Sequence, residues 1–189
     1  MESNLNETIL ENIKTIREDF YKKNSKNRIF KEAQKQECAK YVSETIRLKD
    51  LISHTVFIIP DTNIIFYNYL IFKQYGHESN CPIIMEYFKK LITDTIEQYG
   101  NFEIHFNLQT FSISALQRYS SIIQTAFDEN IMFSEKMNRI VLYYTPHFIE
   151  MITTMFYKSI QTFIKRVEYV SKENSEKQIR IVYSNLNKK

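Results

Sequence analysis

Glycine, proline and tryptophan are scarce in this chain of 189 residues. It holds 2 glycines and 3 prolines and has no tryptophan, whereas an average protein contains about 7% glycine and 5% proline. A loop that cradles nucleotide phosphates needs several glycines at close spacing. Gly76 and Gly100 are far apart, so the composition excludes a loop of that kind.

Cysteine and histidine are also few, and neither occurs at a metal-binding spacing. Cys38 and Cys81 have no neighbouring cysteine, and the 4 histidines are scattered along the chain. Zinc sites and redox pairs require two such residues a few positions apart. We therefore expect neither a metal nor a cofactor. Two unpaired thiols are typical of a reducing compartment.

Long apolar runs are absent as well. No run approaches the roughly 18 residues that indicate a membrane-spanning helix, and the first residues lack the basic and apolar segments of a secretion signal. These absences predict a cytoplasmic protein that is not transmembrane. The contents of 43% hydrophobic and 25% charged residues predict a folded chain with a core of its own.

Positive charge is concentrated in one segment, although the formal net charge is only +3. A net charge this small gives no strong signal of nucleic-acid binding. Basic residues outnumber acidic ones between Lys22 and Lys40, which is either a solvated helix face or a surface for phosphates and anionic lipid head groups. The residues of this predicted basic patch are Lys22, Lys23, Lys26, Arg28, Lys31 and Lys35.

The first 52 residues have the periodicity of helices. Apolar residues recur every three or four positions and so share one stripe of a helix. These residues are Leu5, Ile9, Ile13, Ile16 and Phe20. A polar segment at 23–27 interrupts the pattern, and a second helical pattern follows. We expect residues 1–52 to form a helical hairpin or arm that packs on the rest of the chain or contacts a protein partner.

The chain after residue 53 alternates between strand and helix patterns. Strands are expected at 55–59, 64–72, 102–108, 139–145 and 166–170, with an edge strand at 178–183. Helices are expected between Asn80 and a stop at Gly100, after a cap at Ser112, and from Pro146 through Phe163. The alternation predicts an α/β fold, a mixed and largely parallel sheet flanked by helices, over residues 53–184. Residues 185–189 are expected to be a disordered tail.

The stretch FIIPDTNIIFY at 57–67 has two interpretations. A strand that ends in Asp-Thr-Asn resembles the start of a PIN-type nuclease, whose several carboxylates hold Mg²⁺. The later strands, however, end near Asn107 and Tyr143 without a carboxylate. The favoured interpretation is a hairpin turn in which Pro60 presets the backbone, Asp61 bonds its own backbone and Asn63 tolerates left-handed geometry.

Glu103 and His105 share one face of the strand expected at 102–108, opposite the apolar face that carries Phe106. A carboxylate beside an imidazole can support acid–base chemistry. The other interpretation is a polar strand face that a helix or solvent covers, which is the commoner arrangement.

Four segments over about residues 61–170 resemble the successive elements of one known family. DTNIIFYNYLIF is similar to the family's early turn and strand, and IIMEYFKKLITDTIEQYG to the helix before its central strand. FEIHFNLQTFSISAL resembles that strand and the next helix start. MNRIVLYYTPHFIEMITTMFYKSIQTFIKRVEYV resembles its strand ending in Asn-Ala-Pro with the helix and strand that follow. Together the four segments resemble the CRAL-TRIO lipid-binding family. The alternation of elements also fits a STAS-like regulator.

The resemblance implies a non-enzymatic module that binds a lipid or another small hydrophobic ligand between the sheet and a helix. By that analogy Phe66, Phe106, Phe148 and Met155 line the cavity, whereas apolar faces of this kind usually belong to an ordinary core. The alternative function is a protein-interaction or scaffold domain of the same fold without a cavity. A PIN-like metal-dependent nuclease is the third hypothesis.

Overall fold

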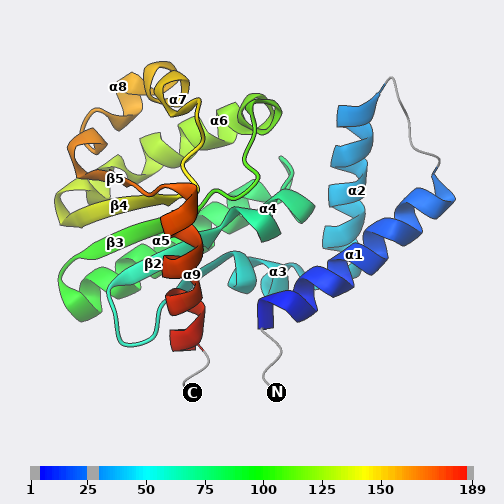
Figure 1. Ribbon diagram of the computed structural model, residues 1–189, viewed down its shortest axis with the longest axis horizontal. Coiled ribbons are helices and arrows are strands. Elements are labelled where there is room, and N and C mark those ends of the chain that lie inside the picture. The colour runs from blue at the N-terminus through cyan, green and yellow to red at the C-terminus, as the bar shows by residue number, and fades with distance from the viewer. Residues whose placement is uncertain (1–4, 25–29, 187–189) are drawn as a thin grey trace.

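The computed structural model describes residues 5–24 and 30–186, and within them five strands form one sheet (Figure 1). The strands are β1 (Val56–Ile58), β2 (Ile64–Asn68), β3 (Phe102–Asn107), β4 (Met137–Tyr143) and β5 (Val167–Tyr169). Their order in the sheet follows their order in the chain. β1 is antiparallel to β2, and the other neighbours are parallel. The predicted α/β fold with a mixed, largely parallel sheet is confirmed.

Two long helices cover one face of the sheet. They are α5 (Cys81–Tyr99) and α6 (Ile113–Asn130), and the short η1 (Ile131–Lys136) leads from α6 to β4. Sequential strand order with right-handed crossovers places both helices on the same face. The expected helix signals are confirmed. Ser112 Oγ accepts a hydrogen bond from the Ala115 amide at 3.3 Å, and Gly100 ends α5 with a φ of 78°.

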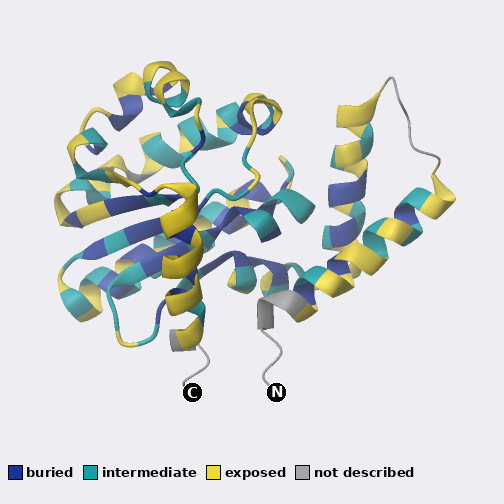
Figure 2. Ribbon diagram, in the orientation of Figure 1, coloured by how far each residue is buried: buried dark blue, intermediate teal, exposed yellow. Residues whose placement is uncertain are grey.

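One helix, α9 (Lys172–Leu186), packs on the opposite face and crosses in front of the sheet (Figure 1). Its Ile179 and Val182 belong to the same buried cluster as Phe66 of β2 and Val141 of β4. The side of α9 that points away from the sheet is exposed (Figure 2). The sheet is therefore covered by helices on both faces, although α9 covers its face alone among the described residues.

The edge strand predicted at 178–183 is wrong, because this segment lies within α9. Apolar residues alternate there, but Ser175, Ile179 and Val182 also recur at helical spacing, and all three are buried. Ser171 Oγ lies 3.5 Å from the Asn174 amide, which suits a helix cap. The cap and the helical burial pattern together explain why the helix forms.

The strand predicted at 64–72 is also too long. β2 ends at Asn68, whose Oδ1 accepts a hydrogen bond from the Leu70 amide at 3.2 Å, and α4 (Tyr69–Tyr75) begins there. The run is apolar throughout, so hydrophobicity alone does not separate its strand from its helix. The capping asparagine makes that separation.

Short elements connect β4 to β5, where one helix was predicted between Pro146 and Phe163. They are α7 (Ile149–Met155), α8 (Tyr157–Ile160) and η2 (Ile164–Arg166). Phe156 and Phe163 of this segment are buried. Met155, which the family resemblance places in the lining of a cavity, is 51% exposed. The break between α7 and α8 explains this outcome, because a straight helix no longer fixes which residues face the core.

The turn between β1 and β2 confirms the predicted hairpin. Ile59 accepts a hydrogen bond from the Thr62 amide at 3.2 Å, and Asp61 has a φ of 60°. Proline followed by a residue of positive φ is the pattern of a type II turn. The structure corrects two details, because Asp61 rather than Asn63 takes the left-handed conformation and the side chain that bonds the turn is Thr62, at 2.8 Å from Ile59 O.

Three helices precede the sheet: α1 (Leu5–Lys23), α2 (Lys31–Thr45) and α3 (Leu48–Thr55). α1 and α2 lie side by side and run in opposite directions (Figure 1). The predicted stripe on α1 is confirmed by the burial of Ile9, Ile13 and Phe20. Ile13 shares a core cluster with residues of α4, α5 and α6, so the hairpin packs on the body of the protein. The predicted boundary between residues 52 and 53 falls inside α3.

Two sequence expectations concern membranes and the C-terminal tail. Among the described residues, no helix combines the length and the apolar character needed to cross a membrane. α9 continues through residues 185 and 186 of the predicted tail, and residues 187–189 lie outside the described part of the chain.

Candidate functional site

The four aromatic and methionine residues expected to line a ligand cavity lie in different places. Phe66 is fully buried under α9, whereas Phe106 faces the layer of α5 and α6 on the other side of the sheet. Phe148 packs against the cluster between α6 and α8, and Met155 is exposed. The structure therefore brings these four residues to no common cavity, and three of them pack in ordinary core clusters.

The predicted basic patch is divided between two helices. Lys22 and Lys23 end α1, Lys31 and Lys35 lie in the first turns of α2, and Lys26 and Arg28 lie outside the described residues. All four described lysines are exposed. Lys35 differs from the other three because it lines a pocket at the junction of the hairpin with the sheet.

Glu103 and His105 belong to a chain of polar contacts on the face of the sheet that α9 covers. His105 Nδ1 lies 2.9 Å from the Tyr143 hydroxyl, and its Nε2 lies 3.3 Å from Glu103 Oε2. Arg139 donates to Glu103 at 2.7 Å and to Glu168 at 3.1 Å. Burial lowers the pKa of His105, and the Glu103 carboxylate opposes this effect only in part.

The His105 and Tyr143 end of this polar chain is closed to a substrate, because His105 is 5% exposed and Tyr143 is 3% exposed. The Arg139 and Glu168 side chains at its other end are exposed. The arrangement matches the interpretation of a polar strand face covered by a helix, since every nitrogen of the imidazole ring has a partner within the sheet. Asp61 lies apart from the ends of the sheet where ligands commonly bind. Its turn precedes β2, so it lies at the amino ends of the parallel strands and not at their carboxyl ends. No group of three potential metal ligands occurs among the described residues.

A pocket of about 350 Å³ lies where the N-terminal hairpin meets the carboxyl ends of β2 and β3. Open α/β sheets commonly bind ligands outside these ends of their strands. One wall comes from α1 and α2, a second from α4 after β2, and a third from the loop after β3 with the start of α6. The pocket therefore exists only because the hairpin packs on the sheet.

Two asparagines at the ends of β2 and β3 shape the loops that carry the pocket. Asn68 caps α4, and Asn107 Oδ1 accepts a hydrogen bond from the Gln109 amide at 3.1 Å. Asn107 Nδ2 lies 3.4 Å from Asn68 Oδ1, and both side chains are buried. These bonds turn each chain sharply at the strand end, which directs α4 and the start of α6 toward the hairpin.

Four cationic side chains from four helices line the pocket: Arg17 of α1, Lys35 of α2, Lys73 of α4 and Arg118 of α6. Lys35 and Arg118 share the carboxylate of Glu32. Arg17 donates to Gln74 Oε1 at 2.5 Å. Neither Arg17 nor Lys73 forms an ion pair within the part of the chain that the structure describes, so positive charge exceeds negative charge around the cavity.

Lys73 lies half-buried at the base of this charge cluster. Its Nζ donates to Thr110 Oγ1 at 2.7 Å, a neutral acceptor. Burial lowers the pKa of Lys73, and the positive charge of Arg17 lowers it further. The ammonium is therefore in an environment that disfavours its charge, which an anion in the pocket would correct.

Hydroxyl groups and the start of α6 complete the donor set. Thr110, Ser112 and Ser114 line the pocket between the end of β3 and the first turn of α6. Thr110 has a φ of 68°, which is unusual for a β-branched residue. The amides at the start of a helix carry partial positive charge that favours an anion nearby.

Tyr69 is the most informative side chain of the wall. It is 5% exposed, it lines the pocket, and its hydroxyl has no hydrogen-bond partner among the described residues. A buried phenol normally has such a partner. Burial raises the pKa of Tyr69 well above its ordinary value, so the hydroxyl stays protonated and is able to donate to a ligand.

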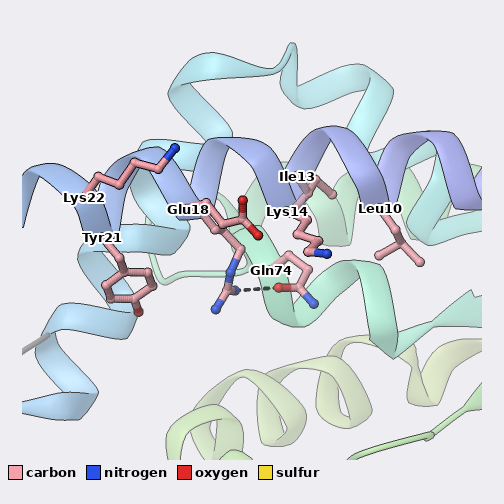
Figure 3. Close-up of a pocket in the computed structure, with 8 residues that line it drawn as sticks. Leu10, Ile13, Lys14, Glu18, Tyr21, Lys22 and Gln74 are labelled. Atoms are coloured by element: carbon pink, nitrogen blue, oxygen red, sulfur yellow. Dashed lines mark hydrogen bonds between the residues drawn. The ribbon is translucent and has the colours of Figure 1, made fainter.

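A second, more open groove of about 600 Å³ runs along α1. Figure 3 shows Leu10, Lys14 and Glu18 on α1 beside Gln74 of α4. The bond between Arg17 and Gln74 lies in the wall of both cavities. This pair therefore separates the more open groove from the less open and more cationic pocket.

Comparisons of the chain with protein-family models, with curated proteins and with solved structures found no match. The CRAL-TRIO resemblance therefore stays a prediction. Of the pocket residues, sequence reasoning singled out Lys35 as a member of the basic patch and Ser112 as a helix cap. It missed Arg17, Lys73 and Arg118, because each is a single charge on an otherwise ordinary helix. One usable signal was the hydroxyl-rich segment between the clearest strand and the next helix, at 110–114.

Proposed function

We propose that this protein is a non-enzymatic binding module whose ligand carries a phosphate group or a similar anion. The observation that supports the proposal is the convergence of Arg17, Lys35, Lys73 and Arg118 on one pocket. Two of these cations, Arg17 and Lys73, have no carboxylate partner in the described part of the chain. An anion between them would gain charge-assisted hydrogen bonds, which are among the strongest in proteins.

The other donors of the pocket suit the same ligand. The hydroxyls of Thr110 and Ser114 and the buried hydroxyl of Tyr69 offer neutral hydrogen bonds beside the cations. Phosphate binds well to such mixtures, because its several oxygens accept from donors in different directions. Apart from two alanines and the rings of Tyr69 and Tyr119, the described lining is formed mainly by polar and charged residues, so the anionic group is the part of the ligand that this pocket recognises.

A binding role rather than catalysis is supported by where the reactive groups lie. The His105 and Tyr143 pair is covered by α9. Burial raises the pKa of the Cys81 thiol to about 11, which keeps it in the less reactive protonated form. The described lining of the anion pocket contains no histidine, cysteine or carboxylate that would serve as a nucleophile or a general base.

The phosphate could belong to a soluble ester or to a lipid head group, and the CRAL-TRIO resemblance favours the lipid. Two titrations separate these sources. Isothermal titration calorimetry with inorganic phosphate measures binding of the shared chemical group, and sedimentation with phosphatidylcholine vesicles, with and without phosphatidic acid, measures binding of the lipid. Binding of phosphate without the vesicles indicates a soluble ester, and binding to phosphatidic acid vesicles indicates a lipid.

The variant Lys73→Met tests whether binding occurs in this pocket. Methionine keeps the length and apolar stem of lysine but removes its charge, so affinity for the bound probe is expected to fall by about tenfold or more, the equivalent of one charge-assisted hydrogen bond. Lys49→Met is the matched control, because Lys49 is an exposed lysine on α3 outside the pocket. Failure of the unaltered protein and of every variant to bind either probe would refute the proposal, as would equal losses in both variants.

A further inference from the structure

Glu32 already contacts two of the cations that line the candidate anion site. Its carboxylate accepts a hydrogen bond from Lys35 Nζ at 2.7 Å and from Arg118 Nε at 3.0 Å, and it also contacts Arg118 Nη2. Lys35 and Arg118 both line the pocket. The contact joins the first turn of α2 to α6, across the junction of the hairpin and the sheet.

We propose that Glu32 is an internal competitor for the ligand, and that the ligand must displace it to engage Arg118 and Lys35. The pocket would then select a phosphate monoester dianion over a carboxylate. This inference rests on the proposed function, since it concerns the selectivity and regulation of the same pocket.

The Glu32 contact has the properties of a displaceable one. The Glu32 side chain is 56% exposed, and ion pairs at that exposure contribute little to stability. The Arg118 side chain is only 17% exposed. The guanidinium is therefore largely buried, whereas Glu32, its present partner, lies at the surface. When the carboxylate turns outward, water solvates it, and the buried guanidinium is left to bind a new anion.

The competitor favours a ligand with more charge than its own. A carboxylate ligand that replaces Glu32 only exchanges one monoanion for another. It must also compete with the Glu32 side chain, whose effective concentration is in the millimolar range or above because Glu32 is part of the same chain. A phosphate monoester carries a charge of about −1.5 to −2 and three acceptor oxygens. It can contact Arg118 while it also approaches Lys73 and Arg17, which Glu32 does not contact.

Glu32 could instead hold Arg118 and Lys35 in position for the ligand, and the two roles predict opposite results for one variant. Glu32→Gln removes the negative charge and keeps the size of the side chain. An internal competitor predicts tighter binding of anions by this variant, whereas a positioning role predicts weaker binding. Glu37→Gln is the matched control, because Glu37 is an exposed residue on α2 outside the pocket.

The experiment is isothermal titration calorimetry of the full chain with inorganic phosphate and, separately, with acetate, at low ionic strength. We expect Glu32→Gln to bind phosphate about two to five times more tightly than the unaltered protein, the size of effect that removal of one competing exposed ion contact gives. Its preference for phosphate over acetate should also fall. Glu37→Gln, which also removes one negative charge, should bind as the unaltered protein does.

The outcomes distinguish failure of the proposed anion binding from failure of the proposed competition by Glu32. Equal or weaker phosphate binding by Glu32→Gln, with binding by the unaltered protein intact, overturns the internal competitor alone. Absence of binding in both overturns the proposed function. Equal gains in Glu32→Gln and Glu37→Gln assign the effect to net charge and also overturn the competitor. Glu32→Ala provides a second variant if Glu32→Gln does not fold, and thermal unfolding of each variant verifies its fold.

Discussion

Lys73 Nζ donates a hydrogen bond of 2.7 Å to Thr110 Oγ1 and thereby joins the helix after β2 to the loop after β3. The lysine is half-buried, and the threonine has the backbone of a left-handed residue. A threonine in that region is strained. The contact therefore combines an uncompensated charge with a strained backbone at one point of the pocket, a combination that is typical of binding sites and unfavourable for stability.

Thr110→Gly should separate stability from binding. Glycine adopts a φ of 68° without strain, so we expect the free energy of unfolding to rise by up to about 1 kcal/mol, after the loss of the Lys73 bond and the greater freedom of the unfolded chain are subtracted. Phosphate affinity should fall, because Lys73 loses its acceptor and the loop its shape. Urea unfolding and calorimetry measure the two effects.

The control for Thr110→Gly is Thr125→Gly in the interior of α6, which should lower stability by a few tenths of a kcal/mol because glycine is the poorer helix former. A loss of stability at Thr110 as large as or larger than the loss at Thr125 would contradict the assignment of strain.

Asp61 should matter for its backbone and not for its carboxylate. Asp61→Gly is expected to leave stability unchanged or to raise it by about 0.5 kcal/mol, because glycine is preferred at the third position of a type II turn. Asp61→Val should lower it by about 1 to 2 kcal/mol, because a β-branched residue resists a φ of 60°. Urea unfolding compares the two variants. Equal losses in both would show that the carboxylate itself stabilises the fold.

The two glycines should respond to substitution for different reasons. At Gly100 an added Cβ meets nothing within 4 Å, so Gly100→Ala should cost only the strain of a φ of 78°, about 1 kcal/mol. At Gly76 an added Cβ lies 2.7 Å from the ring of Phe72, and Gly76→Ala should cost about 1 to 3 kcal/mol through overpacking.

Asparagine distinguishes the two causes at these glycines. Asparagine tolerates left-handed geometry, so Gly100→Asn should be more stable than Gly100→Ala. Gly76→Asn should be less stable than Gly76→Ala, because it places still more atoms against the ring. Thermal unfolding gives the order of the four variants, and the reverse order at either position would refute the corresponding cause.

His105 should make the protein less stable at acidic pH. Its folded pKa lies below the ordinary value of 6.5 because burial disfavours the charged ring, although Glu103 and Glu168 favour it and Arg139 opposes it. The unfolded chain therefore binds the proton more readily, and stability is full above pH about 6.5 and declines as the pH falls below it.

The variant His105→Gln should show a smaller loss of stability between pH 7.5 and 5.5 than the unaltered protein, as measured by urea unfolding at each pH. His77→Gln is the comparison, because burial also lowers the pKa of His77, which Lys40 and Glu44 influence from α2. An unchanged pH dependence in His105→Gln would place the titration elsewhere.

Local chemistry was sufficient for much of the fold. The cap at Ser112, the stop at Gly100 and the turn at Pro60 and Asp61 were predictable because each depends on a few neighbouring residues. Segments with two compatible periodicities were not predictable in the same way. The run at 64–72 and the segment at 178–183 each fit strand and helix. The caps at Asn68 and Ser171, together with packing against α2, α3 and the sheet, decided between them.

Composition and periodicity are properties of neighbouring positions, and they were enough to predict the largely parallel sheet and to exclude glycine-rich phosphate loops. The candidate site, in contrast, depends on how distant segments pack. Arg17 lies on α1, Lys73 on α4 and Arg118 on α6, so the three cations are far apart in the sequence. A pocket between them forms because the apolar stripe of α1 has to be buried. α1 packs on α2, α2 packs on α4, and one core cluster joins these helices to α6, which brings the charges together at the ends of β2 and β3.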